Sequence, residues 1–495
     1  MAFKDLREWI AEIEKANQLK RITVEVDWDL ELAAISRRIC HQGGPALLFE
    51  NIKGHRNTAC RRLFINGLCC RERIAMALGL PKNTPYRGIV EFIKERLAHQ
   101  VAPVKVASGP VKQNIKADDE VNLYEFPVPK YSYLDGGRYI TTYGNVVTMD
   151  PDTKIMNIGI YRGMIGENEK SIPVLLIRSQ HWGIHFTKYE QRGEEMPVAI
   201  FYGWDPTSLF YAGVGVVHPG YSEYELMGGL RGEPVELVKC ETSDLYVPAT
   251  AEIVVEGRIS PNPKTFQMEG PFGEYTGFYG GERTPKPTIR VECVTFRNDP
   301  IFRGGFAGSS PGNLGEASYW MTCARSAVTW KSLEDIGVPN IKGVWSHGIT
   351  NLGNLRVQID KIYRGHAKQV AHAVFGLGAS ALMAKNVIVV DKDIDIFDDD
   401  AVEWALSNRT NAAMGDIQLF PGTIGSPLDT SVPVSERNVA KYGTGKWTRV
   451  FIDATVNWDL EPQEAYGGRR EPPLCTEYPP EINELINRRW REYGF

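Results

Sequence analysis

The sequence predicts a multidomain α/β protein, and two observations support this prediction. The chain has 495 residues, which is more than one hydrophobic core usually supports. Its residue pattern also changes twice. Strand and helix patterns alternate to about residue 100, and short β-branched and aromatic runs separated by Gly, Pro and Asp follow to about residue 303. Helical periodicity returns beyond residue 320. We therefore expect domains at residues 1–112, 113–318 and 319–465, and a tail helix at 466–495.

The N-terminal α/β segment is expected to begin with a surface helix rather than a signal peptide. The stretch MAFKDLREWIAEIEK is charged from Lys4 onward, and its apolar residues have helical spacing. The next stretch, LKRITVEVDWDLELAAISRRIC, predicts a strand with Ile22, Val24 and Val26 on one face, followed by a helix.

The pattern of the middle segment predicts a β-barrel or a highly curved sheet. In ATAEIVVEGRIS, the residues Ala251, Ile253 and Val255 alternate with Glu252 and Glu256, which is the period of a half-buried strand. In the C-terminal segment, NLRVQIDK and KNVIVVDKDIDIF predict strands, whereas KIYRGHAKQVAHAVFGL and DDDAVEWALSNR predict helices. This alternation indicates a parallel α/β domain, and PPEINELINRRWREYGF predicts a terminal helix introduced by proline.

Composition limits the partners. With 43% apolar and 24% charged residues and a formal charge of −5, the chain offers no electrostatic case for nucleic acid or an anionic membrane. No apolar run approaches the roughly 18 residues of a membrane span. The 8 cysteines are scattered without a C-x-x-C pair, so we expect reduced thiols in a cytoplasmic protein whose partners are small molecules and further copies of itself.

Glu269 and Glu274 flank the turn Gly-Pro-Phe-Gly, where the backbone must bend and the two carboxylates can converge. Convergent carboxylates separate in pKa, which makes one of them a proton donor near neutral pH. The alternative is a surface turn with two solvated acids. Arg162, in the apolar stretch IGIYRGMI, must either reach solvent or meet an anion.

Three scattered residues form a second candidate set. Asn157, His181 and Glu223 offer an amide oxygen, an imidazole and a carboxylate, which suit Mg²⁺ or Mn²⁺. Their spacing matches no short metal motif, and each residue alone is explained by an ordinary structural role.

Several long motifs resemble one family. The motifs DGGRYITTYG, MNIGIYRGM, ELVKCETSDLYVPATAEIVVEG, EGPFGEYTGFYGG and VIVVDKDIDIFDDDAVEWAL occur in the order of the UbiD-like decarboxylases that depend on prenylated FMN, over nearly the whole chain. The resemblance implies a split β-barrel flavin-binding domain at 113–318 and an α/β dimerisation domain at 319–465.

The resemblance also implies roles for the candidate residues. Glu269 is the acid/base that protonates the substrate carbon after CO₂ leaves, Arg162 holds the substrate carboxylate and pairs with Glu269, and Glu274 completes the network. A Mn²⁺ or Mg²⁺ ion held by an Asn, a His and a Glu links the cofactor phosphate to the protein. Those ligands fall on Asn157, His181 and Glu223, and further cofactor contacts fall on Gly159, Ile160, Tyr161, Arg162 and Gln180. A K⁺ ion is expected near the carbonyls of Ala212 to Gly215, with Glu223 shared.

The expected substrate pocket contains Thr142, His347, Ser426 and Leu428. His347 stands where phenolic-acid decarboxylases of the family carry a substrate-facing histidine, and Ser426 stands where other members place a bulky aromatic residue or a histidine. The alternative for His347 is a loop residue turned to solvent. The stretch GLGASALMA lacks a cofactor-facing lysine that some fungal members carry.

These features predict a lyase: a reversible, non-oxidative decarboxylase of an aromatic, heteroaromatic or α,β-unsaturated carboxylic acid, with a preference for a phenolic or electron-rich ring. A separate flavin prenyltransferase would supply the cofactor, and the enzyme would be a homodimer or a higher homo-oligomer. The alternative is a split-barrel flavin-binding protein or FMN oxidoreductase. A hydride-transfer flavoprotein has no need of Glu269, Arg162 and Glu274 together, so that set distinguishes the two hypotheses.

Overall fold

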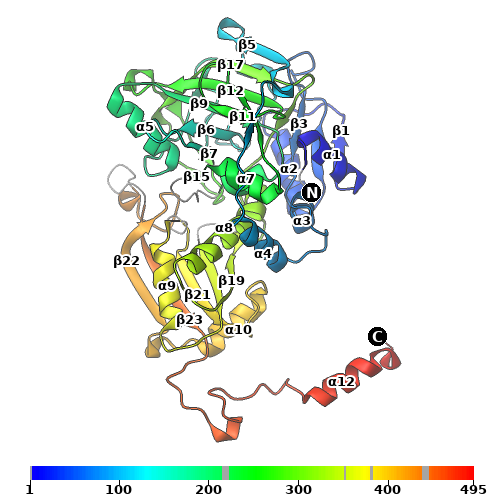
Figure 1. Ribbon diagram of the computed structural model, residues 1–495, viewed down its shortest axis with the longest axis vertical. Helices are drawn as coiled ribbons and strands as arrows, with labels where there is room; N and C mark the ends of the chain where they lie inside the picture. The colour runs from blue at the N-terminus through cyan, green and yellow to red at the C-terminus, as the bar shows by residue number, and fades with distance from the viewer. Residues whose placement is uncertain (1–2, 214–221, 351–352, 379–382, 438–444, 495) are drawn as a thin grey trace.

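The computed structural model describes residues 3–213, 222–350, 353–378, 383–437 and 445–494. Figure 1 shows a mixed α/β molecule in which the N-terminal and central parts lie together above a C-terminal part, with a tail leading away from the body. The predicted mixed α/β class is confirmed, whereas the strand pairing describes open sheets and not a closed barrel.

The N-terminal part is a small sheet with helices packed on it. Its strands follow the order β1-β2-β3-β18, so a strand from the end of the central segment completes the sheet. The strands are β1 (Leu19–Ile22), β2 (Ala46–Phe49), β3 (Arg62–Ile65) and β18 (Ile301–Arg303), and the helices are α1 (Leu6–Lys15), α2 (Glu31–His41), α3 (Arg71–Ala77) and α4 (Tyr86–Arg96). The first helix is confirmed, because Leu6, Trp9, Ile10 and Ile13 are buried. The face predicted for Ile22, Val24 and Val26 is wrong: β1 ends at Ile22, and Val24 is 69% exposed.

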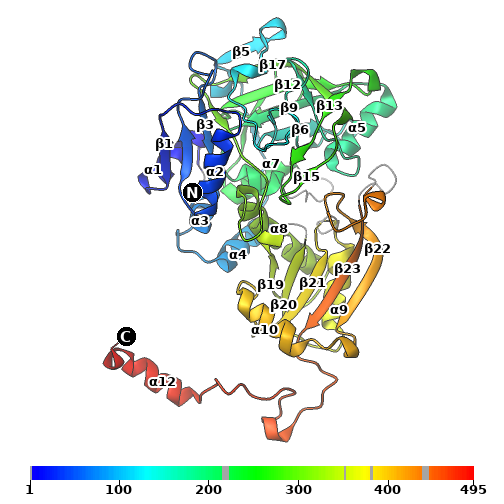
Figure 2. The ribbon, with the colours of Figure 1, turned by 180° about the vertical axis from the view of Figure 1, so that it is seen from behind.

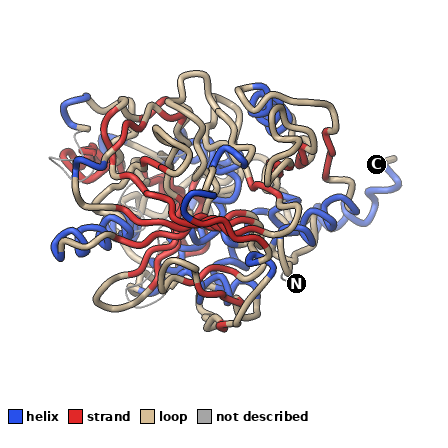
Figure 3. The backbone as a smooth tube through the Cα atoms, turned by 90° about the horizontal axis from the view of Figure 1, so that it is seen from above, coloured by secondary structure: helices blue, strands red, loops and turns tan. Residues whose placement is uncertain are grey.

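A seven-stranded sheet forms the centre of the molecule. Its order is β5-β17-β12-β9-β6-β7, and β8 pairs with β17. These strands are β5 (Asn114–Ala117), β6 (Asn145–Met149), β7 (Met156–Ile160), β8 (Ser171–Pro173), β9 (Met196–Tyr202), β12 (Ile253–Ile259) and β17 (Thr288–Phe296). Seen from above in Figure 3, the strands form a band across the middle with helices and loops on both sides.

Smaller elements surround this sheet. A three-stranded sheet contains β4 (Val104–Lys105), β10 (Glu236–Lys239) and β11 (Tyr246–Pro248), and two short pairs join β13 (Gln267–Glu269) to β16 (Thr284–Lys286) and β14 (Phe272–Gly273) to β15 (Tyr279–Gly280). The helices of the central part are α5 (His181–Arg192), α6 (Ser208–Ala212) and α7 (Glu223–Arg231).

Strand β12 is buried on both faces, which corrects the expected half-buried strand. Glu252 and Glu256 are both 0% exposed. Glu252 accepts hydrogen bonds from Arg7 and Arg297, and Glu256 accepts hydrogen bonds from the backbone of Glu241 and Thr242. Their polar partners allow the acidic face to lie inside the protein.

The C-terminal part is a five-stranded sheet of order β19-β20-β21-β23-β22, whose three inner strands are parallel. The strands are β19 (Ile341–Ser346), β20 (Asn354–Ile359), β21 (Asn386–Asp391), β22 (Ile417–Gly425) and β23 (Gly445–Ala454), and the helices are α8 (Glu316–Asp335), α9 (His366–Gly376) and α10 (Asp399–Arg409). The predicted strands at β20 and β21 and the predicted helices at α9 and α10 are confirmed. Helix α8 packs against both α4 and β19, and so joins the N-terminal part to this sheet.

The tail ends in α12 (Pro480–Arg489), the predicted terminal helix, and none of its residues is buried. Figures 1 and 2 show α12 well separated from the rest of the chain in both views. Among the described helices, none combines the length and the apolar character that a membrane crossing requires. None of the 8 cysteines forms a disulfide.

Candidate active site

The two glutamates and the arginine singled out in the sequence form one buried cluster. The Nη2 atom of Arg162 lies 2.9 Å from Oε2 of Glu269, and its Nη1 atom lies 2.5 Å from Oε1 of Glu274. Glu269 is 0% exposed, Glu274 7% and Arg162 8%. The alternative of a surface turn with two solvated acids is therefore wrong. We call Glu269, Arg162 and Glu274 the triad.

Local backbone geometry brings the triad together. Glu269 ends β13 and Glu274 follows β14, so only the Gly-Pro-Phe-Gly turn at residues 270–273 separates them. The chain itself reverses after Glu274, because β13 pairs with β16 and β14 pairs with β15. Gly270 has a φ of +93°, a conformation that favours glycine. Arg162 follows β7 and also donates through Nη1 to the carbonyl of Gly280, at 3.1 Å. A Cβ atom on Gly281 would lie 2.7 Å from Nη2 of Arg162, so glycine is needed there for the arginine to pass.

Burial and charge act against each other in the triad. Burial alone would lower the pKa of Arg162, but Glu274 and Glu269 outweigh it and raise that pKa above its ordinary value. Burial raises the pKa of Glu274, although Arg162 opposes the shift. The two oxygens of Glu269 accept from Arg162 and from the hydroxyl of Tyr139, at 2.9 and 2.8 Å, whereas Glu274 shares Arg162 without the tyrosine.

Two members of the second candidate set are in contact, and the third contacts the backbone next to them. Nδ1 of His181 lies 3.0 Å from Oδ1 of Asn157, and Oε2 of Glu223 accepts a 2.7 Å hydrogen bond from the backbone N–H of Ile158. His181 and Glu223 are the first residues of α5 and α7, and Asn157 lies on β7. Among the described residues, no three or more His, Cys, Asp or Glu side chains gather as in a metal site. The present set contains only two residues of these types, because its third member is an asparagine.

Glu223 supplies a test of whether a cation fits this place. It is 2% exposed, and it makes no ion pair with any described lysine or arginine. Burial raises its pKa to about 8. A carboxyl group that is this costly to ionise fits a site where a bound cation would stabilise its charge. The donor set of one imidazole nitrogen and two oxygens suits Mn²⁺ or Mg²⁺.

The expected cofactor-contacting residues line the same strand and helix. Gly159, Ile160 and Tyr161 continue β7 from Asn157 toward Arg162, and Gln180 precedes α5. The ring of Tyr161 stacks on Trp182 with centroids 4.2 Å apart and an interplanar angle of 3°. Of the segment expected to hold K⁺, Ala212 and Gly213 are described, whereas Val214 and Gly215 lie outside the described residues. The stretch 376–384 is also described only in part.

Of the expected substrate-pocket residues, Leu428 lies next to the triad. A Cβ on Gly280 would lie 2.6 Å from Cγ of Glu274 and 3.0 Å from Cδ2 of Leu428, so both side chains border the same point. Ser426 is buried, and its hydroxyl accepts a 3.1 Å hydrogen bond from the N–H of Leu428. It also lowers the pKa of Tyr275, the residue after Glu274, against the larger raising effect of burial.

Thr142 and His347 have other partners. Thr142 is buried beside Tyr131 and lowers the pKa of that phenol, against the larger raising effect of burial. The Nε2 atom of His347 lies 2.9 Å from Oδ1 of Asp399, and its side chain is 16% exposed. His347 is therefore not turned to solvent, and its described contacts belong to the C-terminal sheet. Its Nδ1 atom is buried without a described hydrogen-bond partner.

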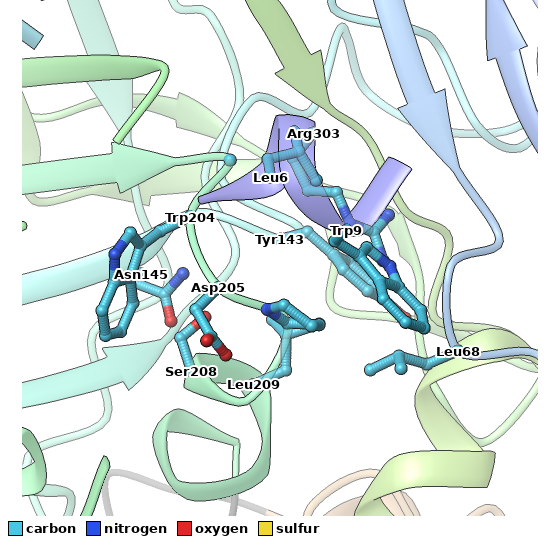
Figure 4. A pocket seen from close by; sticks show the side chains of 12 residues that line it. Leu6, Trp9, Leu68, Tyr143, Asn145, Trp204, Asp205, Ser208, Leu209 and Arg303 are labelled. Atoms are coloured by element: carbon cyan, nitrogen blue, oxygen red, sulfur yellow. The ribbon is translucent and has the colours of Figure 1, made fainter. Parts of the chain in front are cut away.

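A cavity of about 20 Å³ lies between α1 and the central part (Figure 4). Its lining includes Trp9, Tyr143, Asn145, Asp205 and Arg303, and no member of the triad. The volume is enough for a water molecule, and the buried Oδ1 of Asn145 has no described partner. This cavity is too small for an aromatic acid.

Two residues that contact the triad or its turn escaped the sequence analysis. Tyr139 donates to Glu269, and Asp135 accepts a 2.8 Å hydrogen bond from the N–H of Gly273, between the two glutamates. Both belong to the motif DGGRYITTYG. The sequence does show a tyrosine and an aspartate four residues apart in a glycine-rich stretch, which is a pattern that could mark a functional loop. The local sequence does not show which residues they contact.

Comparison with known proteins identifies the family. Residues 10–93, 102–310 and 318–454 match the N-terminal, Rift-related and C-terminal domains of 3-octaprenyl-4-hydroxybenzoate carboxy-lyase, which are the three UbiD domain models. The chain is 32% identical to the pyrrole-2-carboxylic acid decarboxylase of Pseudomonas aeruginosa, over 99% of this chain and 98% of that protein. It is 31% identical to the phenolic acid decarboxylase of Sedimentibacter hydroxybenzoicus, over 99% of both chains.

Solved structures agree with this relationship. The vanillic acid decarboxylase of Sedimentibacter hydroxybenzoicus in its closed form superposes with a TM-score of 0.87 at 29% identity, covering 100% of this chain and 99% of that one. An evolved dimeric form of the UbiD-class enzyme HmfF from Pelotomaculum thermopropionicum, in complex with prFMN, gives a TM-score of 0.78 at 28% identity, covering 97% of this chain and 98% of that one. The chain therefore belongs to the UbiD family of carboxy-lyases and is a decarboxylase.

Proposed function

We propose that this decarboxylase uses prenylated FMN and acts reversibly, without net oxidation, on aromatic, heteroaromatic or α,β-unsaturated carboxylic acids. The observation that carries the proposal is the buried triad, which offers one cationic and two acidic groups at a single point. The named relatives act on pyrrole-2-carboxylic and phenolic acids, and this supports a ring acid as substrate. We place the cofactor in the central domain, 113–318, and infer that its curved sheet is a split β-barrel.

The residues of the chain have separate tasks in this reaction. When bound, prenylated FMN supplies an electron sink for the carbanion that forms as CO₂ leaves. Arg162 orients the substrate carboxylate, and its Nε atom is a buried donor without a partner in the described part of the chain. One glutamate then delivers a proton to the ring carbon, and in the carboxylation direction it removes that proton.

Sequence resemblance assigns the proton to Glu269, and the surroundings of Glu274 make it a second candidate. Each oxygen of Glu269 accepts one hydrogen bond, from Tyr139 or from Arg162, so two partners hold this side chain in place. Burial raises the pKa of Glu274, which keeps a proton on that group to higher pH than on an exposed glutamate. Glu274 also borders Leu428 on the side of the C-terminal part. The resemblance makes Glu269 the first assignment, and the raised pKa of Glu274 makes Glu274 the competing one.

Asn157, His181 and Glu223 would hold Mn²⁺ or Mg²⁺ together with the cofactor phosphate, and K⁺ would bind nearby with Glu223 shared. Because α5 and α7 begin at His181 and Glu223, their N-terminal dipoles favour an anion there. A separate flavin prenyltransferase would supply the cofactor. Free cysteines and the absence of a membrane-spanning helix among the described residues are consistent with a cytoplasmic enzyme.

We also propose that the chain forms a homodimer or a higher homo-oligomer through its C-terminal domain and tail. The tail carries exposed apolar side chains that a lone subunit leaves in water. They include Leu474, Tyr478, Ile482 and Tyr493, with exposures from 39% to 61%. A second copy would cover them.

The function is tested by a screen of carboxylic acids with enzyme produced together with a flavin prenyltransferase. CO₂ release and bicarbonate-dependent exchange of ring hydrogen in D₂O are measured for hydroxybenzoic, pyrrole-2-carboxylic and cinnamic acids. We expect turnover with at least one ring acid, and a larger rate for the hydroxylated member of a matched pair. A yellow protein that reduces or oxidises nicotinamide cofactors and releases no CO₂ would support the oxidoreductase alternative.

A further inference from the structure

The loop at residues 130–139 wraps around the turn that carries the two glutamates. Oδ1 of Asp135 accepts from the N–H of Gly273 at 2.8 Å, and its Oδ2 accepts from the N–H of Ser132 at 2.8 Å. The N–H of Gly136 donates to the carbonyl of Pro271, also at 2.8 Å. One carboxylate therefore ties the loop to the end of the turn, directly before Glu274.

The loop and the turn are in backbone contact. A Cβ atom on Gly136 would lie 2.1 Å from the carbonyl oxygen of Gly270, and a Cβ on Gly273 would lie 2.6 Å from Oγ of Ser132. No side chain separates the two segments at these points. Any displacement of the loop would therefore be passed directly to the backbone that positions the glutamates.

Tyr139 holds the other end of the same turn. Its hydroxyl lies 2.8 Å from Oε1 of Glu269 and 3.0 Å from the carbonyl of Pro271. Asp135 and Tyr139 thus contact the turn on opposite sides of the Gly-Pro-Phe-Gly sequence. Together they hold the backbone of the turn at both ends, next to Glu269 and next to Glu274.

The N-terminal part supports the loop at both ends. Lys130 exchanges backbone hydrogen bonds with Trp28 and Leu30, at 3.1 and 3.3 Å. Nη2 of Arg138 lies 3.2 Å from Nε2 of His55. Between these ends, the guanidinium of Arg37 on α2 lies over the ring of Phe306 at 5.2 Å and reaches Oγ of Ser132 at 3.5 Å. The loop is therefore held between the N-terminal part and the triad.

The carboxylate of Asp135 is costly to bury. It is 5% exposed and has no ion pair within the described part of the chain, and the nearest opposite charges are Lys130 and Arg37. Burial raises its pKa against the lowering effect of its two backbone hydrogen bonds. A neutral residue would avoid this cost, so the carboxylate is best explained by the two N–H groups that it aligns.

We propose that Asp135 is a positioning residue for the triad: its carboxylate fixes the turn at Gly273 so that Glu269 and Glu274 meet Arg162 and the substrate in the geometry needed for proton transfer. The N-terminal part braces the loop that carries Asp135. This inference rests on the proposed decarboxylase function and adds a residue and a role to it. A misplacement of about 1 Å can slow an enzyme by about 10²-fold, so a residue that touches neither substrate nor cofactor can control turnover.

The test compares Asp135→Asn and Asp135→Ala in cofactor-loaded enzyme. An asparagine can satisfy only one of the two N–H groups with its single carbonyl oxygen, and an alanine satisfies neither. We expect kcat per bound cofactor to fall by roughly 10-fold in Asp135→Asn and further in Asp135→Ala, with KM within about twofold of wild type. The ratio of turnover in H₂O to that in D₂O should rise, because proton transfer becomes slower relative to the other steps.

Asp5→Asn is the control for loss of a buried carboxylate elsewhere. Asp5 is 7% exposed and also accepts a backbone hydrogen bond, from Glu8 at 3.0 Å, but it caps α1 away from the triad and, unlike Asp135, pairs with Arg297 at 2.8 Å. We expect a lower melting temperature with an unchanged kcat and isotope ratio. If Asp135→Asn lost activity only in proportion to folded, cofactor-loaded protein, with an unchanged isotope ratio, its role would be structural and the inference wrong. A wild-type enzyme inactive on every acid would overturn the proposed function as well, which separates the two failures.

Discussion

Replacing each glutamate of the triad by glutamine decides which one donates the proton. Glutamine keeps the size of the side chain and removes its acidity. In Glu274→Gln, the 2.5 Å contact with Arg162 loses its negative partner, and hydrogen bonds to charged groups contribute roughly 1.5–3 kcal/mol. Because Arg162 keeps its 2.9 Å contact with Glu269, we expect the variant to fold and to retain cofactor.

The expected loss in turnover follows from the role of a general acid. Removing such a group slows a reaction by roughly 10²-fold to 10⁴-fold, and 10²-fold corresponds to about 2.7 kcal/mol of activation free energy. If Glu269 is the donor, as the resemblance implies, Glu269→Gln loses at least this factor and Glu274→Gln loses less. If Glu274 is the donor, the order is reversed.

A pH profile separates the donor from its neighbour. A proton donor is active in its protonated form, so decarboxylation falls as the pH rises through the pKa of the donor. Burial raises the pKa of Glu274, so for Glu274 this fall lies above the range of an exposed glutamate. The variant that lacks the donor should also lack the fall. The assay is initial CO₂ release across pH, normalised to bound cofactor.

Glu282→Gln serves as the control, because Glu282 is an exposed glutamate in the same hairpin and should leave turnover unchanged. Near-normal turnover in both Glu269→Gln and Glu274→Gln would refute the reasoning for either assignment. It would move the proton to a group outside the triad and leave the buried cluster as a structural feature.

Three further results are expected. His181→Ala should give folded protein that no longer retains prenylated FMN, since the cation and phosphate would lose a ligand, and normal flavin occupancy by absorbance would contradict the metal assignment. Removing the tail, 466–495, should weaken the oligomer in light scattering, and a monodisperse full-length monomer of about the 55.5 kDa chain mass would contradict the assembly proposal. His347→Phe should reduce the preference for 4-hydroxybenzoate over cinnamate in competition assays. An unchanged ratio would reject the phenolic preference and leave the decarboxylase standing.

Local sequence patterns predicted the elements that have one clear apolar face. Helix α1 shows this well, because Leu6, Trp9, Ile10 and Ile13 repeat at helical spacing and all four are buried. The same rule failed for β12, where Glu252 and Glu256 read as a solvent face. Their burial depends on Arg7, Arg297 and backbone N–H groups from distant parts of the chain, and no local pattern contains that information.

The candidate site shows the same division between local and distant information. The bend between Glu269 and Glu274 could be predicted, because glycine and proline disfavour a continuous strand there. Their meeting with Arg162, more than a hundred residues earlier in the chain, was supplied by resemblance and then found in the structure. Of the second set, the structure brings Asn157 and His181 into contact, and the metal site with Glu223 stays a prediction. Asp135 was missed, because a buried aspartate beside two glycines looks identical to a turn residue until its partner is known.

The triad and the expected pocket residues belong to different parts of the fold, and this has a consequence for specificity. The acids and the arginine are held by short strands of the central part, braced from the N-terminal side through residues 130–139. Leu428 and Ser426 approach the same point from the C-terminal part, where Leu428 borders Glu274 and Ser426 influences the pKa of Tyr275. If the proposed roles are right, the proton chemistry belongs to the central part, and the wall that a substrate ring would meet belongs to the C-terminal part. Substitutions at Leu428 and Ser426 would then change the substrate preference and leave the contacts among Glu269, Arg162 and Glu274 in place.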